Sequence, residues 1–167
     1  DMDSIFRSPD AAAFAFFVEH GWALTATLDA DDAVTLGVWV DEIMAWPDDG
    51  DWLHYREMTE GGPRLCRTEN FVPYHAELRA LLTEGPMVDT ASALLGESAV
   101  LYQEKINYKA AGGAGYEPDT EGPAYPFVKS HASFMAALAA AHPETGRLGV
   151  VAGLAGAYLR CAPVVLP

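Results

Sequence analysis

Four polar side chains alternate with other residues along the segment from Tyr102 to Lys109, and their chemistry suits an anionic ligand. If this segment is a β-strand, Gln103, Lys105, Asn107 and Lys109 lie on one face, because side chains alternate between the two faces of a strand. Two cations and two amides are costly to bury without a partner, and a small carboxylate or phosphate would satisfy them. The same pattern also fits the solvated outer face of an edge strand, so both interpretations stay open.

A helical N-terminal part and a strand-rich remainder must position this segment. Ser8 as N-cap, Pro9 as first helical residue and Gly21 as terminator predict a helix that ends at His20. Up to residue 95 the pattern further predicts a half-buried strand over 22–28, a helix from Asp29 to the turn before Pro47, two short strands around 61–63, and helices over 74–83 and 87–95. After these it predicts a strand over 99–109, a loop over 110–123, a strand or short helix over 130–141 and a buried strand over 148–152. Helices followed by strands indicate the α+β class.

Length, charge and cysteine content exclude several classes of protein. The chain has 167 residues and a formal net charge of −14, from 24 acidic and 10 basic residues, so it should repel nucleic acid and anionic membrane surfaces. Its size favours a single domain over residues 1–167. Cys66 and Cys161 form neither a metal motif nor a disulfide framework, and no signal peptide opens the chain. We therefore expect a cytoplasmic protein with no nucleic-acid or membrane partner.

Three further motifs accompany the polar segment: 65–71 (LCRTENF), 94–97 (LLGE) and 145–151 (TGRLGVV). In order and spacing they resemble the phytanoyl-CoA dioxygenase family, which comprises non-haem iron and 2-oxoglutarate-dependent oxygenases with a jelly-roll core. The resemblance covers most of residues 14–153. It implies an α+β fold in which N-terminal helices pack on a partial or modified double-stranded β-helix, jelly-roll or cupin-like, in a single domain shortened at its C-terminal side.

The resemblance also implies roles for individual residues. In that family the strand similar to 102–109 contributes to the co-substrate and substrate sites. By position, Lys105 and Asn107 would hold the carboxylate of 2-oxoglutarate. Gln103, Arg67 and Tyr125 would contact the substrate.

The expected iron ligands are replaced in this sequence. Family members carry a His-x-Asp pair directly after Gly-Tyr-x-Pro, and this pair supplies two of the three iron ligands. Here Asp119 and Glu121 hold those positions. Two carboxylates bind Mg²⁺ or Mn²⁺ weakly and lack the imidazole that suits Fe(II), so the cofactors are either Fe(II) with 2-oxoglutarate, as the resemblance implies, or none. An acidic surface loop without any metal is the alternative interpretation.

Three functions remain open at this point. We rank first a small-molecule enzyme of biosynthetic tailoring that has lost ordinary iron chemistry and catalyses cyclisation, isomerisation or elimination, with Lys105 stabilising charge and Asp119 or Glu121 acting as general base. The second is a working Fe(II)/2-oxoglutarate hydroxylase whose remaining ligands lie outside the sequence in hand. The third is a non-catalytic binding or scaffold protein that forms a homodimer through a sheet edge. In the first two, the ligand is a small molecule that bears a carboxylate.

Overall fold

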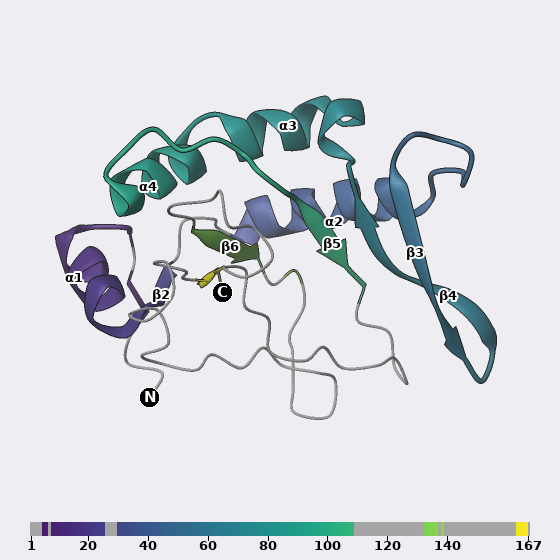
Figure 1. Ribbon diagram of the computed structural model, residues 1–167, viewed down its shortest axis with the longest axis horizontal. Helices are drawn as coiled ribbons and strands as arrows, with labels where there is room; N and C mark the ends of the chain where they lie inside the picture. Colours follow the sequence, from purple (N-terminus) through teal and green to yellow (C-terminus); the bar gives the residue numbers. More distant parts are fainter. Residues whose placement is uncertain are drawn as a thin grey trace.

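The computed structural model describes residues 5–6, 8–25, 30–108, 132–136, 138 and 163–166. Figure 1 shows α3 and α4 along one side of the molecule, α1 and β2 near one end, and the β3–β4 hairpin at the opposite end. The described elements follow in the order β1 (Ile5–Phe6), α1 (Ala11–His20), β2 (Ala23–Thr25), α2 (Ala30–Met44), β3 (Leu53–Thr59), β4 (Gly62–Glu69), the short 3₁₀ helix η2 (Val72–Tyr74), α3 (Ala76–Thr83), α4 (Pro86–Leu95), β5 (Lys105–Asn107), β6 (Ser133–Ala136) and β7 (Pro163–Leu166).

Helix α1 forms where the sequence predicts it, but its N-cap is a different residue. The Asp10 carboxylate accepts hydrogen bonds from the amides of Ala12 and Ala13, both at 3.0 Å. The prediction of Ser8 as N-cap is wrong, because the Asp10 side chain reaches the free amides of the first turn while the Ser8 carbonyl accepts from the Asp10 amide. Gly21 ends the helix with a φ of 81°, as expected of a glycine terminator.

Helix α2 supplies the apolar stripe that builds the larger core. Leu36 and Ile43 are buried on it, and half-buried Trp39 lies on the same face at helical spacing. These side chains pack against Phe71 and other buried residues that follow the hairpin. A smaller cluster joins α1 to β2 through Phe17 and Ala23.

Helix α3 begins later than the sequence predicts. Residues 72–74 form η2, which contains Pro73, and His75 is the N-cap of α3 because its Nδ1 accepts from the Leu78 amide at 3.2 Å. Helix α4 ends at Gly96, whose φ of 71° is left-handed. Both helices confirm the predicted regions: the first residue differs by two positions in α3 and by one in α4, and the last residue agrees in both.

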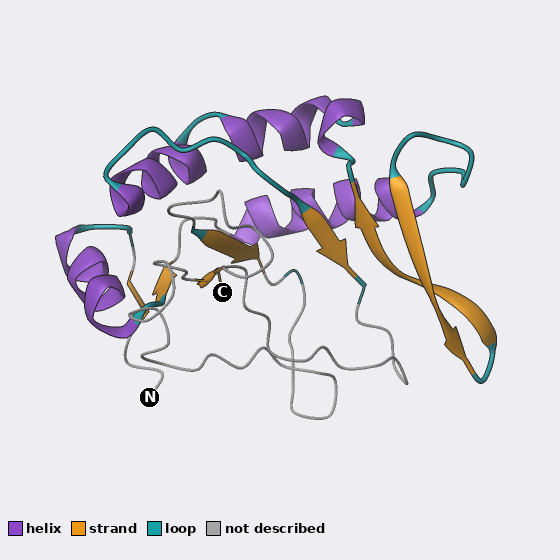
Figure 2. Ribbon diagram, in the orientation of Figure 1, coloured by secondary structure: helices purple, strands orange, loops and turns teal. Residues whose placement is uncertain are grey.

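Strands β3, β4 and β5 form an antiparallel sheet in that order, shown as orange arrows in Figure 2. The predicted hairpin is confirmed. Strand β5 is shorter than the predicted strand 99–109, because β4 turns away at Asn70, with a φ of 57°, and Glu69–Lys105 is the last pair. Before Lys105 the chain is held by other hydrogen bonds: the Ala99 amide donates to Ser92 Oγ, and Glu104 accepts from the Val72 amide.

The second sheet has the order β1-β2-β7-β6, with every pair parallel. The region 130–141, predicted as strand or helix, contains strand β6. Helices combined with these sheets confirm the α+β class. The described strands by themselves do not make up a jelly roll, whose sheets are antiparallel, so that core remains a prediction. No helix in the described ranges has the length and apolar character needed to cross a bilayer.

Candidate anion-binding face

Register across the three-stranded sheet brings several predicted site residues together. Arg67 on β4 lies opposite Asn107 on β5, and Glu69 lies opposite Lys105. Tyr55 on β3 lies opposite Arg67. These five side chains, which we call the polar face, share one side of the sheet because directly paired residues and residues two apart along a strand point the same way.

The other side of the sheet faces the helical core. Ile106, between Lys105 and Asn107, packs against the cluster that contains Leu36 and Ile43. Thr68, between Arg67 and Glu69, is fully buried. The polar face is therefore the side that points away from α2, and the alternation expected from the sequence holds over β5.

Arg67 is held from two directions. Its guanidinium carbon lies 4.3 Å from the centre of the Tyr55 ring, a cation–π contact. Its Nε lies 3.0 Å from Glu69 Oε1, although the angle does not make this ion pair a hydrogen bond. The Tyr55 hydroxyl donates to the other Glu69 oxygen at 3.5 Å, a long contact. Tyr55 and Glu69 thus restrict the position of the arginine before any ligand binds.

Lys105 and Asn107 are exposed, whereas the Arg67 side chain is 30% exposed. With all three charged side chains ionised, the polar face carries two positive charges and one negative charge. This net positive charge stands out on a chain whose overall charge is −14. A cation beside an amide donor is the combination that binds a carboxylate or phosphonate oxygen.

The remaining predicted residues are placed differently. Gln103 is exposed and precedes β5, so the strand does not align it with Lys105. Lys109, Asp119, Glu121 and Tyr125 lie outside the described residues.

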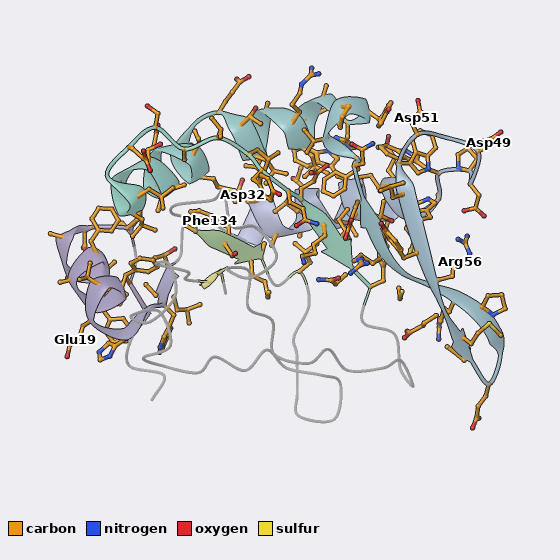
Figure 3. All side chains as sticks on the ribbon, in the orientation of Figure 1. Glu19, Asp32, Asp49, Asp51, Arg56 and Phe134 are labelled. Carbon is orange, nitrogen blue, oxygen red and sulfur yellow. The ribbon has the colours of Figure 1, made fainter. Side chains whose placement is uncertain are left out.

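Figure 3 shows Asp49 and Asp51 in the acidic turn before β3, and Arg56 on the hairpin.

Iron finds no ligand set among the residues that the structure describes. They contain no group of three histidine, cysteine, aspartate or glutamate side chains that could hold a metal. The pair Asp119 and Glu121 offers carboxylate oxygens without imidazole, which does not match the two-histidine, one-carboxylate set typical of non-haem Fe(II) oxygenases. We therefore assign no iron ligand and derive no chemical step through a metal.

Sequence reasoning missed Tyr55 and Glu69. Both are ordinary strand residues, and their role depends on a register that places Tyr55 and Arg67 side by side and sets Glu69 opposite Lys105. A glutamate two residues after Arg67, just past the predicted strand, was the available signal, since residues two apart on a strand share a face.

The chain is similar in sequence to three curated proteins. The chain is 48% identical over 122 residues to a methylphosphonate hydroxylase of Gimesia maris, an alignment that covers 72% of this chain and 47% of that protein. It is 36% identical over 120 residues to a 2-aminoethylphosphonate dioxygenase of the uncultured bacterium HF130_AEPn_1, covering 69% of this chain and 46% of that protein. It is 35% identical over 125 residues to the dioxygenase lolE1 of Epichloe uncinata, covering 74% and 49%.

The chain therefore spans about half the length of the curated relatives it matches. No family model and no solved structure matches it. All three relatives are named as hydroxylases or dioxygenases, so the chain resembles part of an oxidoreductase in each case.

Proposed function

We propose that the protein is an Fe(II)/2-oxoglutarate-dependent hydroxylase of the phytanoyl-CoA dioxygenase type that acts on a small anionic molecule, with its iron ligands outside the described residues. The observation that carries this proposal is the coincidence of two independent features. The three relatives bear hydroxylase or dioxygenase names, and the polar face places Arg67, Lys105 and Asn107 side by side. A jelly-roll core is part of the proposal.

The proposal gives three residues of the polar face a binding role. Lys105 supplies a positive charge and Asn107 an amide donor to one carboxylate of 2-oxoglutarate. Arg67, already oriented by Tyr55 and Glu69, binds an anionic group of the substrate. Iron, when bound, would supply the activation of dioxygen.

We propose phosphonates as the substrate class. Two of the three relatives have a phosphonate in their names, methylphosphonate in one and 2-aminoethylphosphonate in the other. A phosphonate presents three oxygens to hydrogen-bond donors, and a guanidinium can bind two of them at once. Arg67 is thus better suited to this group than a lysine would be.

Product analysis tests the proposed reaction. The full-length protein is incubated with Fe(II), 2-oxoglutarate and either methylphosphonate or 2-aminoethylphosphonate, and succinate and hydroxylated product are quantified. We expect succinate and product in equal amounts with at least one phosphonate. Succinate formed with a non-phosphonate carboxylic acid alone would retain the hydroxylase and reject the phosphonate.

A second candidate function rests on the sequence at 119 and 121. Carboxylates stand where the family has its His-x-Asp pair, and either Asp119 or Glu121 could serve as general base in a non-oxidative reaction on the same anionic substrate. Conversion of a phosphonate without consumption of 2-oxoglutarate, and without one equivalent of bound iron, would favour this function over the hydroxylase.

A further inference from the structure

A second group of polar side chains lies on the opposite side of the same three strands. His54 on β3 has its Nδ1 2.8 Å from Thr68 Oγ1 on β4, and this oxygen lies 3.0 Å from the hydroxyl of Tyr108, directly after β5. The other ring nitrogen of His54 lies 3.3 Å from the Trp46 carbonyl oxygen. This His54–Thr68–Tyr108 chain therefore links all three strands and ties them to the turn that follows α2.

The partners of the chain fix the direction of its hydrogen bonds. A carbonyl oxygen can only accept, so His54 donates from Nε2 to Trp46, and in the neutral ring its Nδ1 is then the acceptor. Thr68 consequently donates to His54 and accepts from the Tyr108 hydroxyl. Burial is the main cause that raises the pKa of Tyr108. The phenol is therefore protonated at neutral pH, as its role as donor to Thr68 requires.

Each member of this chain is the immediate neighbour of a residue on the polar face. His54 precedes Tyr55, Thr68 follows Arg67, and Tyr108 follows Asn107. Because side chains alternate along strands, the two groups stand back to back across one layer of backbone. The positions of Tyr55, Arg67 and Asn107 are thereby coupled to part-buried hydrogen bonds on the other side.

We propose that the His54–Thr68–Tyr108 chain positions the polar face, with Thr68 as the residue that fixes Asn107 and Lys105 opposite Arg67 and Glu69. The inference rests on the proposed function, because it concerns the same face. Within the described residues, strand β5 pairs with β4 through three residue pairs, of which Thr68–Ile106 is the middle one, and the Tyr108 amide donates to the Cys66 carbonyl at 2.9 Å. A slip of one residue would turn Lys105 and Asn107 to the helical side.

The side-chain hydrogen bonds resist such a slip in a way that the short backbone ladder alone does not. The hydroxyl of Thr68 is the shared partner of both neighbouring strands, and its residue is 0% exposed, so water does not reach this hydroxyl while the sheet stays closed. Loss of this hydroxyl would leave His54 Nδ1 and the Tyr108 hydroxyl each without this partner. We therefore expect β5 to be the element that moves.

Substitution of Thr68 tests this role in the full-length protein. Thr68→Val keeps the shape and removes both hydrogen bonds, whereas Thr68→Ser keeps the hydroxyl. Thr90→Val is the matched control, because Thr90 is also buried and its hydroxyl donates to the Pro86 carbonyl within α4. The measurements are the Kd of 2-oxoglutarate by calorimetry, KM and kcat for succinate release, and hydrogen exchange of the β5 amides.

We expect Thr68→Val to raise the Kd and the KM for 2-oxoglutarate about tenfold, with kcat changed less, and to speed exchange in β5. Thr68→Ser should stay within about twofold of the unaltered protein. Thr90→Val should lower stability and leave the Kd unchanged. If Thr68→Val does not fold, Tyr108→Phe, which removes one hydroxyl at the end of the chain, should give a smaller change in the same direction.

Three outcomes would overturn the inference. The first is that Thr68→Val and Tyr108→Phe both bind 2-oxoglutarate like the unaltered protein, and the second is that Thr90→Val changes the Kd as much as Thr68→Val does. The third is that hydrogen exchange of the β5 amides is unchanged in Thr68→Val. Failure of the proposed function gives a different result. In that case the unaltered protein itself binds no 2-oxoglutarate, and the exchange of the β5 amides still decides whether Thr68 holds the strand.

Discussion

The two sides of the β3-β4-β5 sheet differ in whether their polar side chains have hydrogen-bond partners within the protein or are exposed. On the helical side, His54, Thr68 and Tyr108 satisfy one another and the backbone of Trp46. On the other side, Lys105 and Asn107 are exposed. Polar groups that are buried and satisfied stabilise a fold, while exposed cations and amides gathered by register can bind a ligand. The difference separates residues that hold the sheet together from exposed residues that we propose bind a ligand.

Truncation of the hydrophobic core on the helical side of the sheet should have the largest effect on stability. Ile43→Ala removes a side chain that is 0% exposed, and we expect a loss of about 2–5 kcal/mol in the free energy of unfolding. The 2-oxoglutarate affinity of the folded fraction should be unchanged. Chemical denaturation and calorimetry measure the two quantities. Val38→Ala on the exposed side of the same helix is the control and should cost under about 0.5 kcal/mol.

Truncation on the polar face should instead weaken ligand binding and leave stability almost unchanged. Lys105→Ala removes a charge-assisted hydrogen bond to the proposed carboxylate, worth about 1.5–3 kcal/mol, so the Kd of 2-oxoglutarate should rise roughly 10- to 100-fold. Stability should hardly change, because the lysine is exposed. Arg79→Ala, an exposed cation on α3, is the control for a general loss of positive charge. Undiminished binding and turnover in Lys105→Ala would contradict the assignment of the site.

Glu69 offers a smaller test of the polar face. Glu69→Gln removes the one negative charge of the polar face while keeping its size, so anion affinity should rise about two- to fivefold at low salt. The gain should shrink as ionic strength increases, because salt screens partly exposed charges. Titration with 2-oxoglutarate at two salt concentrations measures it. A fall in affinity would instead show that the contact of Glu69 with Arg67 matters more to binding than its charge.

The smallest expected effect concerns the pH dependence of stability. Burial is the main cause that raises the pKa of Tyr108 in the folded state, so the unfolded chain loses this proton first as the pH rises past about 10. The contribution of Tyr108 is therefore fully present below that pH and is lost as the pH rises toward the folded-state pKa. Denaturation at a series of pH values should show a shallower alkaline decline for Tyr108→Phe. An equal decline in both proteins would show that Tyr108 is accessible to solvent.

Several elements were predictable from the sequence because their signals are local. The apolar stripe that contains Leu36 and Ile43 marks the buried face of α2, and Gly21 and Gly96 end their helices with left-handed backbone. Glycines 61 and 62 mark the hairpin. Each of these signals involves residues within a few positions of one another, so it can be recognised in the sequence without knowledge of the tertiary contacts.

The site was predictable only in part. The alternation of Lys105 and Asn107 could be found in the sequence, because it needs no partner strand. The positions of Tyr55 and Glu69 could not, since these depend on which residues face each other across strands. The length of β5 also escaped prediction, because it is set by the turn of β4 at Asn70.

The sequence by itself determined the α+β class, the main helices, the hairpin and the alternating polar residues of β5. Each of these features depends on residues that lie only a few positions apart in the chain. Tertiary structure alone decided that Arg67 lies between Tyr55 and Asn107, and that Thr68 joins His54 to Tyr108. The physical reason is that strand pairing brings together residues far apart in the chain, such as Thr68 with His54, 14 positions away, and with Tyr108, 40 positions away. Only the register of the folded sheet selects which of them meet.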